Sequence, residues 1–178
     1  MADRRRVIEA IWTGRGKPAR VARALLAPAE VLYRAVVVTR GKFYDWGIFR
    51  AKRFSVPVLS VGNLSVGGTG KTPVAAWLAR RFAGMGSVPA IVLRGYGGDE
   101  ILVHERLNEG IPVIASADRV RGIREAIAEG VDVVVLDDAF QHRRARRDAD
   151  VLLVSADAWT GKPRLLPAGI RFHRPARR

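Results

Sequence analysis

Eight residues decide the fold of this chain: Ser65-Val66-Gly67-Gly68-Thr69-Gly70-Lys71-Thr72. An apolar run at Val56–Val61 precedes them, and a helical pattern over Thr72–Phe82 follows. A strand, a glycine-rich turn and a helix in this order are typical of a P-loop, in which backbone N–H groups surround a phosphate at a helix N-terminus. The stretch therefore predicts a site for a nucleoside triphosphate with magnesium.

The loop offers both backbone and side-chain contacts to a nucleotide. Lys71 is expected to reach the β- and γ-phosphates, and the hydroxyl of Thr72 is expected to ligate Mg²⁺. The usual pattern has glycine where Ser65 stands, so this position departs from it. The residues expected to cradle the nucleotide are Ser65, Val66, Gly67, Gly68, Thr69, Gly70, Lys71 and Thr72.

A second motif, Val133-Val134-Val135-Leu136-Asp137-Asp138, is an apolar strand that ends in two carboxylates. P-loop proteins need such a strand as their second magnesium-binding element. Asp137 is the predicted partner of magnesium, and Asp138 either binds magnesium or positions a nucleophile. The motif is common alone and becomes specific only together with the P-loop.

Two further segments are expected at the same edge of the sheet, because ligands bind at the carboxyl ends of parallel strands. Arg94-Gly95-Tyr96-Gly97-Gly98-Asp99-Glu100 directly follows a predicted strand at Pro89–Leu93. There Arg94 is a candidate phosphate contact and either acid a candidate base, although a surface turn explains the pattern as well. The basic run after Gln141-His142 either holds an anionic substrate or is a solvated face.

The rest of the pattern alternates between strands and helices. It places strands at Pro112–Ala115, Val131–Leu136 and Val151–Val154, and a helix at Asp118–Glu129. This order predicts an α/β fold of the P-loop NTPase type, with a doubly wound, mostly parallel sheet. The chain has no cysteine, which excludes disulfides and thiolate metal sites.

The N-terminal region, residues 1–54, is basic and contains an amphipathic helical pattern at Val21–Val38. Arg23, Glu30 and Arg34 fall on one side of this helix and leave a wide apolar face. Pro28 either starts the main helix or kinks an earlier one. The apolar face lies on a membrane surface or packs on the core of the domain, and the pattern alone favours packing.

The formal net charge of +14 would attract nucleic acid, an anionic membrane or phosphorylated substrates, although an arginine-rich composition accounts for it as well. Aromatic residues are sparse and do not alternate with the basic runs, which argues against a nucleic-acid platform. No signal peptide and no membrane-spanning run is visible, so the expected location is the cytoplasm.

Taken together, the motifs resemble those of the tetraacyldisaccharide 4'-kinase (lipid A 4'-kinase) family over about residues 26–169. In that family Ser or Thr stands where Ser65 does, so the departure becomes a match. The motifs that follow in the family's order are Arg94-Gly95-Tyr96-Gly97, Gly98-Asp99-Glu100, Asp118-Arg119, Asp137-Asp138-Ala139-Phe140-Gln141-His142, Arg147-Asp148 and Leu165-Leu166-Pro167-Ala168-Gly169.

The resemblance implies a membrane-associated kinase that uses ATP and Mg²⁺ to phosphorylate the 4'-hydroxyl of tetraacyldisaccharide 1-phosphate, giving lipid IVA in lipid A biosynthesis. It further implies an N-terminal helix that contacts the anionic cytoplasmic face of the inner membrane. Asp99 would be the catalytic base, acting with Lys71 and Asp138, while Thr72 and Asp137 would hold the metal. The implied substrate-binding residues are Asn63, Arg94, Gln141 and His142.

The chain also departs from the family's pattern. The Arg-Gly-Tyr-Gly and Gly-Asp-Glu motifs share Gly97-Gly98, Ile101 replaces a proline, and Ala139 replaces a frequent glycine. The family continues into a second lobe, whose histidine partners the base and has no counterpart here. The expected organisation is a membrane-contacting region at 1–54, the N-terminal kinase lobe at 55–170 and a basic tail at 171–178. The alternative function is a catalytically incompetent fragment that binds nucleotide or membrane.

Overall fold

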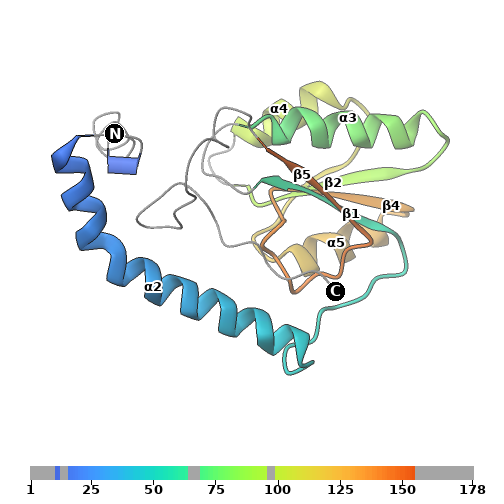
Figure 1. Cartoon of the computed structure of the whole chain (residues 1–178). Coiled ribbons are helices and arrows are strands. Elements are labelled where there is room, and N and C mark those ends of the chain that lie inside the picture. The colour runs from blue at the N-terminus through green and yellow to red at the C-terminus, as the bar shows by residue number, and fades with distance from the viewer. Residues whose placement is uncertain (1–10, 13–15, 64–68, 96–98, 155–178) are drawn as a thin grey trace. The chain divides into compact units, whose positions relative to one another are not determined.

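The computed structural model describes residues 11–12, 16–63, 69–95 and 99–154 of the chain (Figure 1). These residues divide into two compact units, one within residues 11–46 and the other within residues 47–154. The first unit consists mainly of one long helix, and the second is an α/β domain.

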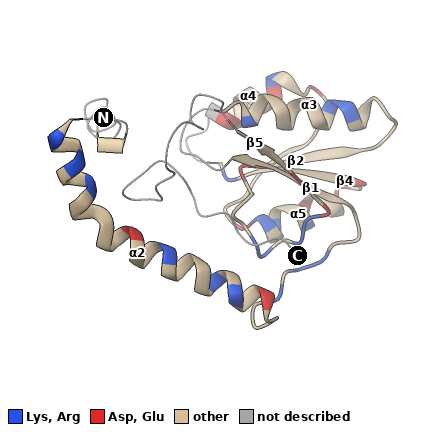
Figure 2. Cartoon of the chain, viewed as in Figure 1, with Lys and Arg blue, Asp and Glu red and all other residues tan. Residues whose placement is uncertain are grey.

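Helix α2 (Lys17–Asp45) extends well beyond the predicted helix at 21–38. Pro18 occupies its first turn, where no backbone N–H is needed, and Gly16 is the N-cap. Pro28 lies inside the helix, so the prediction that it starts the main helix was wrong. No residue of α2 is buried, and basic side chains outnumber acidic ones along it (Figure 2).

The domain is built on a five-stranded sheet in the order β3-β2-β4-β1-β5, and all four strand pairs are parallel. This confirms the predicted α/β fold. The strands are β1 (Val58–Asn63), β2 (Pro89–Leu93), β3 (Val113–Ala115), β4 (Val133–Asp137) and β5 (Ala149–Leu153). Strands β2 and β4 are buried along their whole length, which explains their unbroken apolar sequences.

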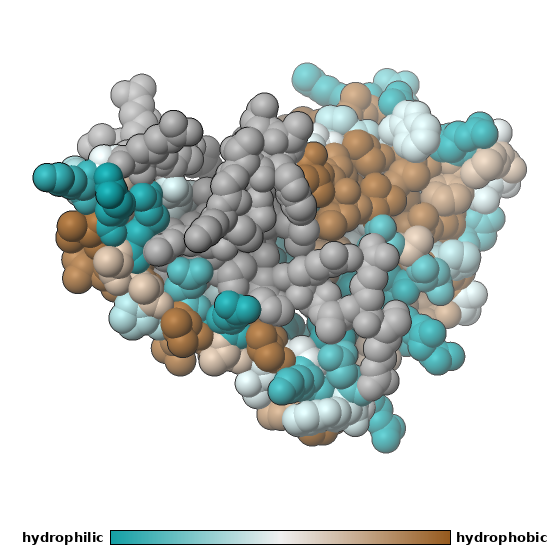
Figure 3. All heavy atoms as spheres, in the orientation of Figure 1, coloured by the Kyte–Doolittle hydropathy of each residue, from teal (hydrophilic) through white to brown (hydrophobic). Residues whose placement is uncertain are grey.

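Helices cover both faces of the sheet. Helices α3 (Lys71–Ala83) and α4 (Asp99–Leu107) lie on one face, and α5 (Arg119–Ala128) lies on the other (Figure 1). The α3 face has a core around Val61, Ile91 and Val135, whose apolar rim faces the viewer in Figure 3. The residues of that rim include Val74, Leu78, Phe82, Val151 and Leu153.

Helix α5 packs closely against the sheet at Gly122. A Cβ atom on Gly122 would lie 2.7 Å from Val92 Cγ1, so only glycine allows this approach. Helix α5 begins after Asp118, whose carboxylate accepts a hydrogen bond from Val120 N at 3.0 Å. Asp118 therefore caps α5 shortly after the end of β3.

Helix α4 was not predicted, because its first residues were interpreted as a ligand-binding turn or a surface turn. Its acidic N-terminus, Asp99-Glu100, favours helix formation through the helix dipole. A polar residue, His104, occupies a core position in this helix and interrupts the apolar period. A periodic signal of nine residues with such an interruption is weak.

The segment that connects the two units joins the α/β domain. Lys52 N donates to Arg144 O at 2.8 Å, and Arg146 N donates to Lys52 O at 2.9 Å. Phe54 and Val56 pack against the core on the α5 face. The basic residues near position 52 therefore lie beside the basic run at 143–146.

Candidate functional site

The site lies where strands β1 and β4 end side by side. Val61 of β1 pairs with Asp137, the last residue of β4. Helix α3 begins at Lys71 after Gly70, whose φ of 78° is a left-handed conformation that favours glycine. The N-terminus of α3 and the carboxylates of β4 therefore share the carboxyl edge of the sheet.

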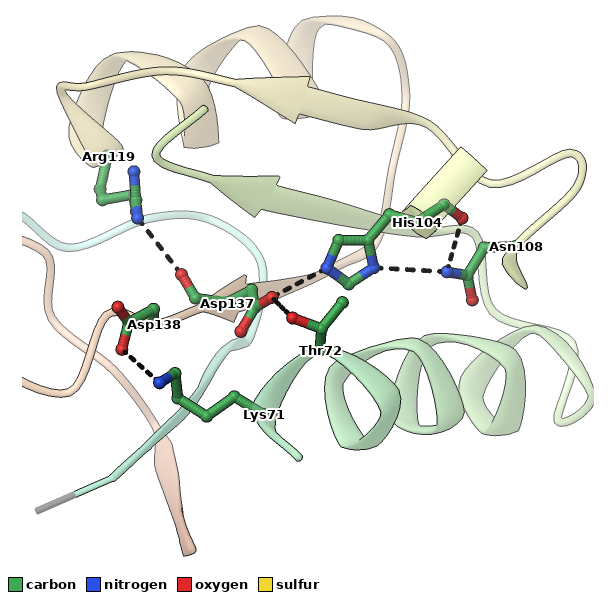
Figure 4. A network of polar contacts seen from close by, with 7 residues as sticks. All are labelled: Lys71, Thr72, His104, Asn108, Arg119, Asp137 and Asp138. Atoms are coloured by element: carbon green, nitrogen blue, oxygen red, sulfur yellow. Dashed lines mark hydrogen bonds and ion pairs between the residues drawn. The ribbon is translucent and has the colours of Figure 1, made fainter. Parts of the chain in front are cut away.

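Thr72 and Asp137 are in direct contact. Thr72 Oγ1 donates to Asp137 Oδ2 at 3.1 Å, which leaves the lone pairs of the hydroxyl oxygen available (Figure 4). Asp137 is buried, and its other oxygen, Oδ1, has no hydrogen-bond partner among the residues that the structure describes. A buried carboxylate oxygen without a partner is costly, and a bound cation would satisfy it.

These two residues therefore fit a magnesium ion. Among the described residues no group of three or more His, Asp or Glu side chains could hold a metal. Magnesium is usually held by one or two protein groups together with the phosphates of a nucleotide, so a site of this size suits it.

Lys71, which is partly buried, and the exposed Asp138 form the second pair of charged groups at the site. Lys71 Nζ lies 3.6 Å from Asp138 Oδ1. Asp138 has a φ of 52°, which is uncommon for any residue except glycine and indicates backbone strain. The turn separates the two carboxylates, because Asp137 is buried at the end of β4 while the side chain of Asp138 is 65% exposed.

Sequence reasoning missed a buried histidine at this site. His104 Nε2 lies 2.9 Å from Asp137 Oδ2, and both side chains are buried. Asn108, one turn later in the chain, donates from Nδ2 to His104 O at 2.9 Å. The available signal was a histidine at a core position on the segment that follows Asp99-Glu100.

A buried arginine holds the backbone of the same turn. Arg119 Nη2 donates to Asp137 O at 3.2 Å, and Nη1 donates to Ser116 O at 2.7 Å. Burial lowers the pKa of the Arg119 guanidinium, and the charge of Asp138 acts in the opposite direction. Arg119 thus connects the carboxyl ends of β3 and β4.

The structure brings Lys71, Thr72, Asp137 and Asp138 together, as expected from the motifs. Residues 65–68 lie outside the described part of the chain. Asp99 is the first residue of α4, and its side chain also lies outside what the structure describes.

The predicted substrate-binding residues lie at or just after the carboxyl ends of strands, but they differ in burial and contacts. Asn63 is buried and donates from Nδ2 to Thr69 Oγ1 at 2.9 Å, so it connects the two ends of the P-loop. Arg94 is exposed directly after β2, and Gln141 is exposed in the turn after β4, next to His142. Their roles in binding substrate stay predictions.

One arginine of the basic run has a structural role. Arg147 Nη1 donates to the carbonyls of Ala139 at 2.9 Å and Phe140 at 3.1 Å, and its Nε lies 3.0 Å from Asp150 Oδ1. This guanidinium therefore holds the loop that follows β4. The neighbouring Arg144 and Arg146 remain exposed.

Comparison with protein families decides the relationship. The model of the family described as "Tetraacyldisaccharide-1-P 4'-kinase" matches residues 22–101 and 97–174. The chain belongs to this family. The match covers most of the chain and includes the P-loop, the carboxylates of β4 and all of helix α2 from residue 22 onward.

Individual relatives agree with this assignment. The chain is 41% identical to a tetraacyldisaccharide 4'-kinase of Halorhodospira halophila, over 91% of this chain and 54% of that protein. It is 38% identical to one of Chlorobaculum parvum, over 84% of this chain and 49% of that protein. The chain thus spans about half the length of these tetraacyldisaccharide 4'-kinases.

A solved structure of the family has the same fold. The crystal structure of LpxK from Aquifex aeolicus in complex with ATP matches with a TM-score of 0.77 and 35% identity. The match covers 84% of this chain and 54% of that one. The resemblance inferred from the motifs is confirmed at the level of family and fold.

Proposed function

We propose that this chain binds MgATP at the carboxyl edge of its sheet and transfers the γ-phosphoryl group to the 4'-hydroxyl of a tetraacyldisaccharide 1-phosphate, giving lipid IVA. The observation that carries the proposal is the contact between Thr72 and Asp137, which joins the P-loop helix to the carboxylate strand. Membership of the kinase family supplies the choice of acceptor.

The P-loop would hold the triphosphate. Backbone N–H groups at the start of α3 would bind the phosphates, the helix dipole would favour their negative charge, and Lys71 adds a positive charge beside them. Thr72 and Asp137 would hold magnesium, which neutralises charge on the phosphates when it is bound. Asp138 keeps Lys71 close to the β4 turn until the phosphates compete for it.

Asp99 would act on the acceptor. It would orient the 4'-hydroxyl and take its proton as the oxygen attacks. A new bond forms between this oxygen and the γ-phosphorus, the bond to the β,γ-bridging oxygen breaks, and ADP leaves. Arg94, Gln141, His142 and Asn63 are proposed to bind the substrate around this position.

Helix α2 would bring the chain to its lipid substrate on the cytoplasmic face of the inner membrane. Val21, Leu25, Leu32 and Val36 are all more than half exposed. At 100° per residue they fall within about 60° of one another, so they form an apolar stripe along one face of a helix whose charged residues are mostly basic (Figure 2). Such a stripe suits peripheral contact with an anionic bilayer.

No described helix has the length and apolar composition needed to cross a membrane.

A transfer assay tests the proposal. The purified chain is incubated with γ-labelled ATP, Mg²⁺ and tetraacyldisaccharide 1-phosphate in mixed micelles, with Lys71→Ala as the control variant. We expect labelled lipid from the wild-type chain only. Equal labelling by both proteins would contradict the site assignment.

The same experiment distinguishes the kinase activity from a second possible function. The alternative is nucleotide or membrane binding without transfer, for which the contacts of Lys71 and Thr72 would suffice. Mg²⁺-dependent ATP binding with no labelled lipid would support this alternative over the kinase.

A further inference from the structure

His104 is a buried polar side chain that the proposed chemistry leaves without a role. It is inaccessible to solvent and lies in the second turn of α4, five residues after Asp99. Burying an imidazole costs free energy unless its nitrogens are paired, and an apolar residue would fill the same space at lower cost. Its partner is the carboxylate of Asp137 rather than a nearby backbone group.

Two donors converge on one oxygen atom of Asp137. His104 Nε2 lies 2.9 Å and Thr72 Oγ1 lies 3.1 Å from Oδ2 (Figure 4). These contacts restrict rotation of the carboxylate about its Cβ–Cγ bond. The restriction decides where the second oxygen, Oδ1, points, and this atom has no partner among the described residues. In Figure 4 it points toward the side of the site where Lys71 lies.

Asn108 supports this orientation of the imidazole. Its Nδ2 donates to His104 O and lies 3.5 Å from the ring Nδ1. An amide N–H beside Nδ1 suits the tautomer that carries its proton on Nε2, and that proton then points to Asp137. Asp137, His104 and Asn108 thus form a buried chain of polar contacts from β4 into α4.

We infer that His104 is a positioning residue that fixes the Asp137 carboxylate, presents its second oxygen to magnesium and couples the metal site to α4, the helix that begins at Asp99. The inference rests on the proposed function. Three elements meet at Asp137 Oδ2: α3 through Thr72, α4 through His104, and β4 itself. Asp137 Oδ2 therefore links the proposed metal ligands, Thr72 and Asp137, to α4, the helix that begins with the proposed base Asp99.

The test measures how strongly ATP binding depends on magnesium. Binding of a fluorescent ATP analogue to the full chain is followed while Mg²⁺ is titrated, and binding in EDTA is recorded for comparison. His104→Leu removes the donor, whereas the side-chain amide of His104→Gln reaches the place of Nε2. We expect His104→Leu to raise the half-saturating Mg²⁺ concentration roughly 10- to 100-fold, as is typical when the partner of a metal ligand is lost.

We expect His104→Gln to remain within a few-fold of the wild-type Mg²⁺ concentration, because it keeps a donor to Oδ2. Binding in EDTA should change little in either variant. Ile101→Ala is the matched control, since it weakens the packing of α4 against the core without touching Asp137. It should lower the melting temperature but leave the Mg²⁺ dependence unchanged.

A folded His104→Leu protein with the wild-type Mg²⁺ requirement would overturn the inference while leaving the proposed function standing. If His104→Leu does not fold, the pair His104→Gln and His104→Asn decides, because the shorter Asn amide cannot reach Oδ2. Equal Mg²⁺ requirements in that pair would overturn the inference. If ATP binding by the wild-type chain does not depend on Mg²⁺, both the proposed function and the inference are wrong.

Discussion

The carboxyl edge of β1 and β4 and the helix α2 depend on opposite kinds of stabilisation. At the sheet edge, Asp137, His104 and Arg119 are polar yet buried, and each is held by specific contacts. Along α2 no residue is buried, and apolar Leu25 and Leu32 are 77% and 67% exposed. A buried polar network tolerates little change, because an unpaired member costs free energy.

An exposed helix follows different rules. With 29 residues, α2 is long enough to form largely from local interactions. Its apolar stripe has no buried member, so a substitution there alters a surface rather than a packed core. The comparison therefore predicts large single-residue effects at the sheet edge and small effects on stability along α2.

The largest effect is expected for Lys71→Ala, at the sheet edge. Removing the ammonium group leaves the charge of the phosphates uncompensated, so ATP binding and transfer should fall by roughly 100-fold or more. Equilibrium binding of a fluorescent ATP analogue measures the loss. The control is Lys52→Ala, which removes an exposed lysine from the same domain. Equal ATP affinities in the two variants would refute the P-loop assignment.

The next effect is expected for Gly62→Ala in β1. A Cβ atom there would lie 2.4 Å from Phe140 Cβ and 3.2 Å from Phe140 N, so the loop after β4 must move. Urea denaturation should show a loss of about 1–3 kcal/mol in the free energy of unfolding. Gly84→Ala is the matched control, because φ is −65° and the nearest atom is 3.4 Å away. Similar losses in both variants would show that the close approach of Gly62 to Phe140 does not cause the loss of stability.

A smaller loss is expected for Arg147→Met. The substitution keeps the apolar stem but removes the Arg147 donor from the carbonyls of Ala139 and Phe140, although Ala139 O still accepts from His142 N. The free energy of unfolding should fall by about 1–3 kcal/mol, toward the lower end because the site is only partly enclosed. Arg146→Met, at an exposed position, should be nearly neutral in the same denaturation experiment. Equal free energies of unfolding for Arg147→Met and Arg146→Met would contradict a structural role of Arg147.

The smallest effect on stability is expected for Leu25→Gln combined with Leu32→Gln. Both side chains are exposed, so the free energy of unfolding should stay within about 0.5 kcal/mol of the wild type. Binding to anionic vesicles should nevertheless weaken roughly tenfold, because two apolar groups no longer enter the bilayer. Co-sedimentation with vesicles measures this.

Val31→Gln is the matched control for the vesicle experiment. Val31 is 68% exposed, but it lies on the basic side of α2, outside the apolar stripe. Its vesicle binding should remain close to that of the wild type. Equal weakening by Val31→Gln and by the double variant would show that no specific face of α2 contacts the membrane.

Much of the α/β domain was predictable from local patterns. Strand β2 was predicted with its observed bounds, and β4 and helix α3 were predicted to within two residues at each end. Glycine spacing and apolar periodicity act over short stretches of chain, so they survive in the sequence. The start of α2 was misplaced, because Pro28 is tolerated inside a helix that Pro18 helps to begin.

The sequence alone determined three features: the P-loop, the paired carboxylates, and the alternation of strands and helices. They could be predicted because each is a local pattern with a fixed spacing. The contacts of His104, Arg119 and Arg147 could not. His104 lies 33 positions from Asp137, and only the parallel order of the strands and the packing of α4 bring them together. Local chemistry thus selected the kind of site, and long-range packing decided which buried groups hold it in place.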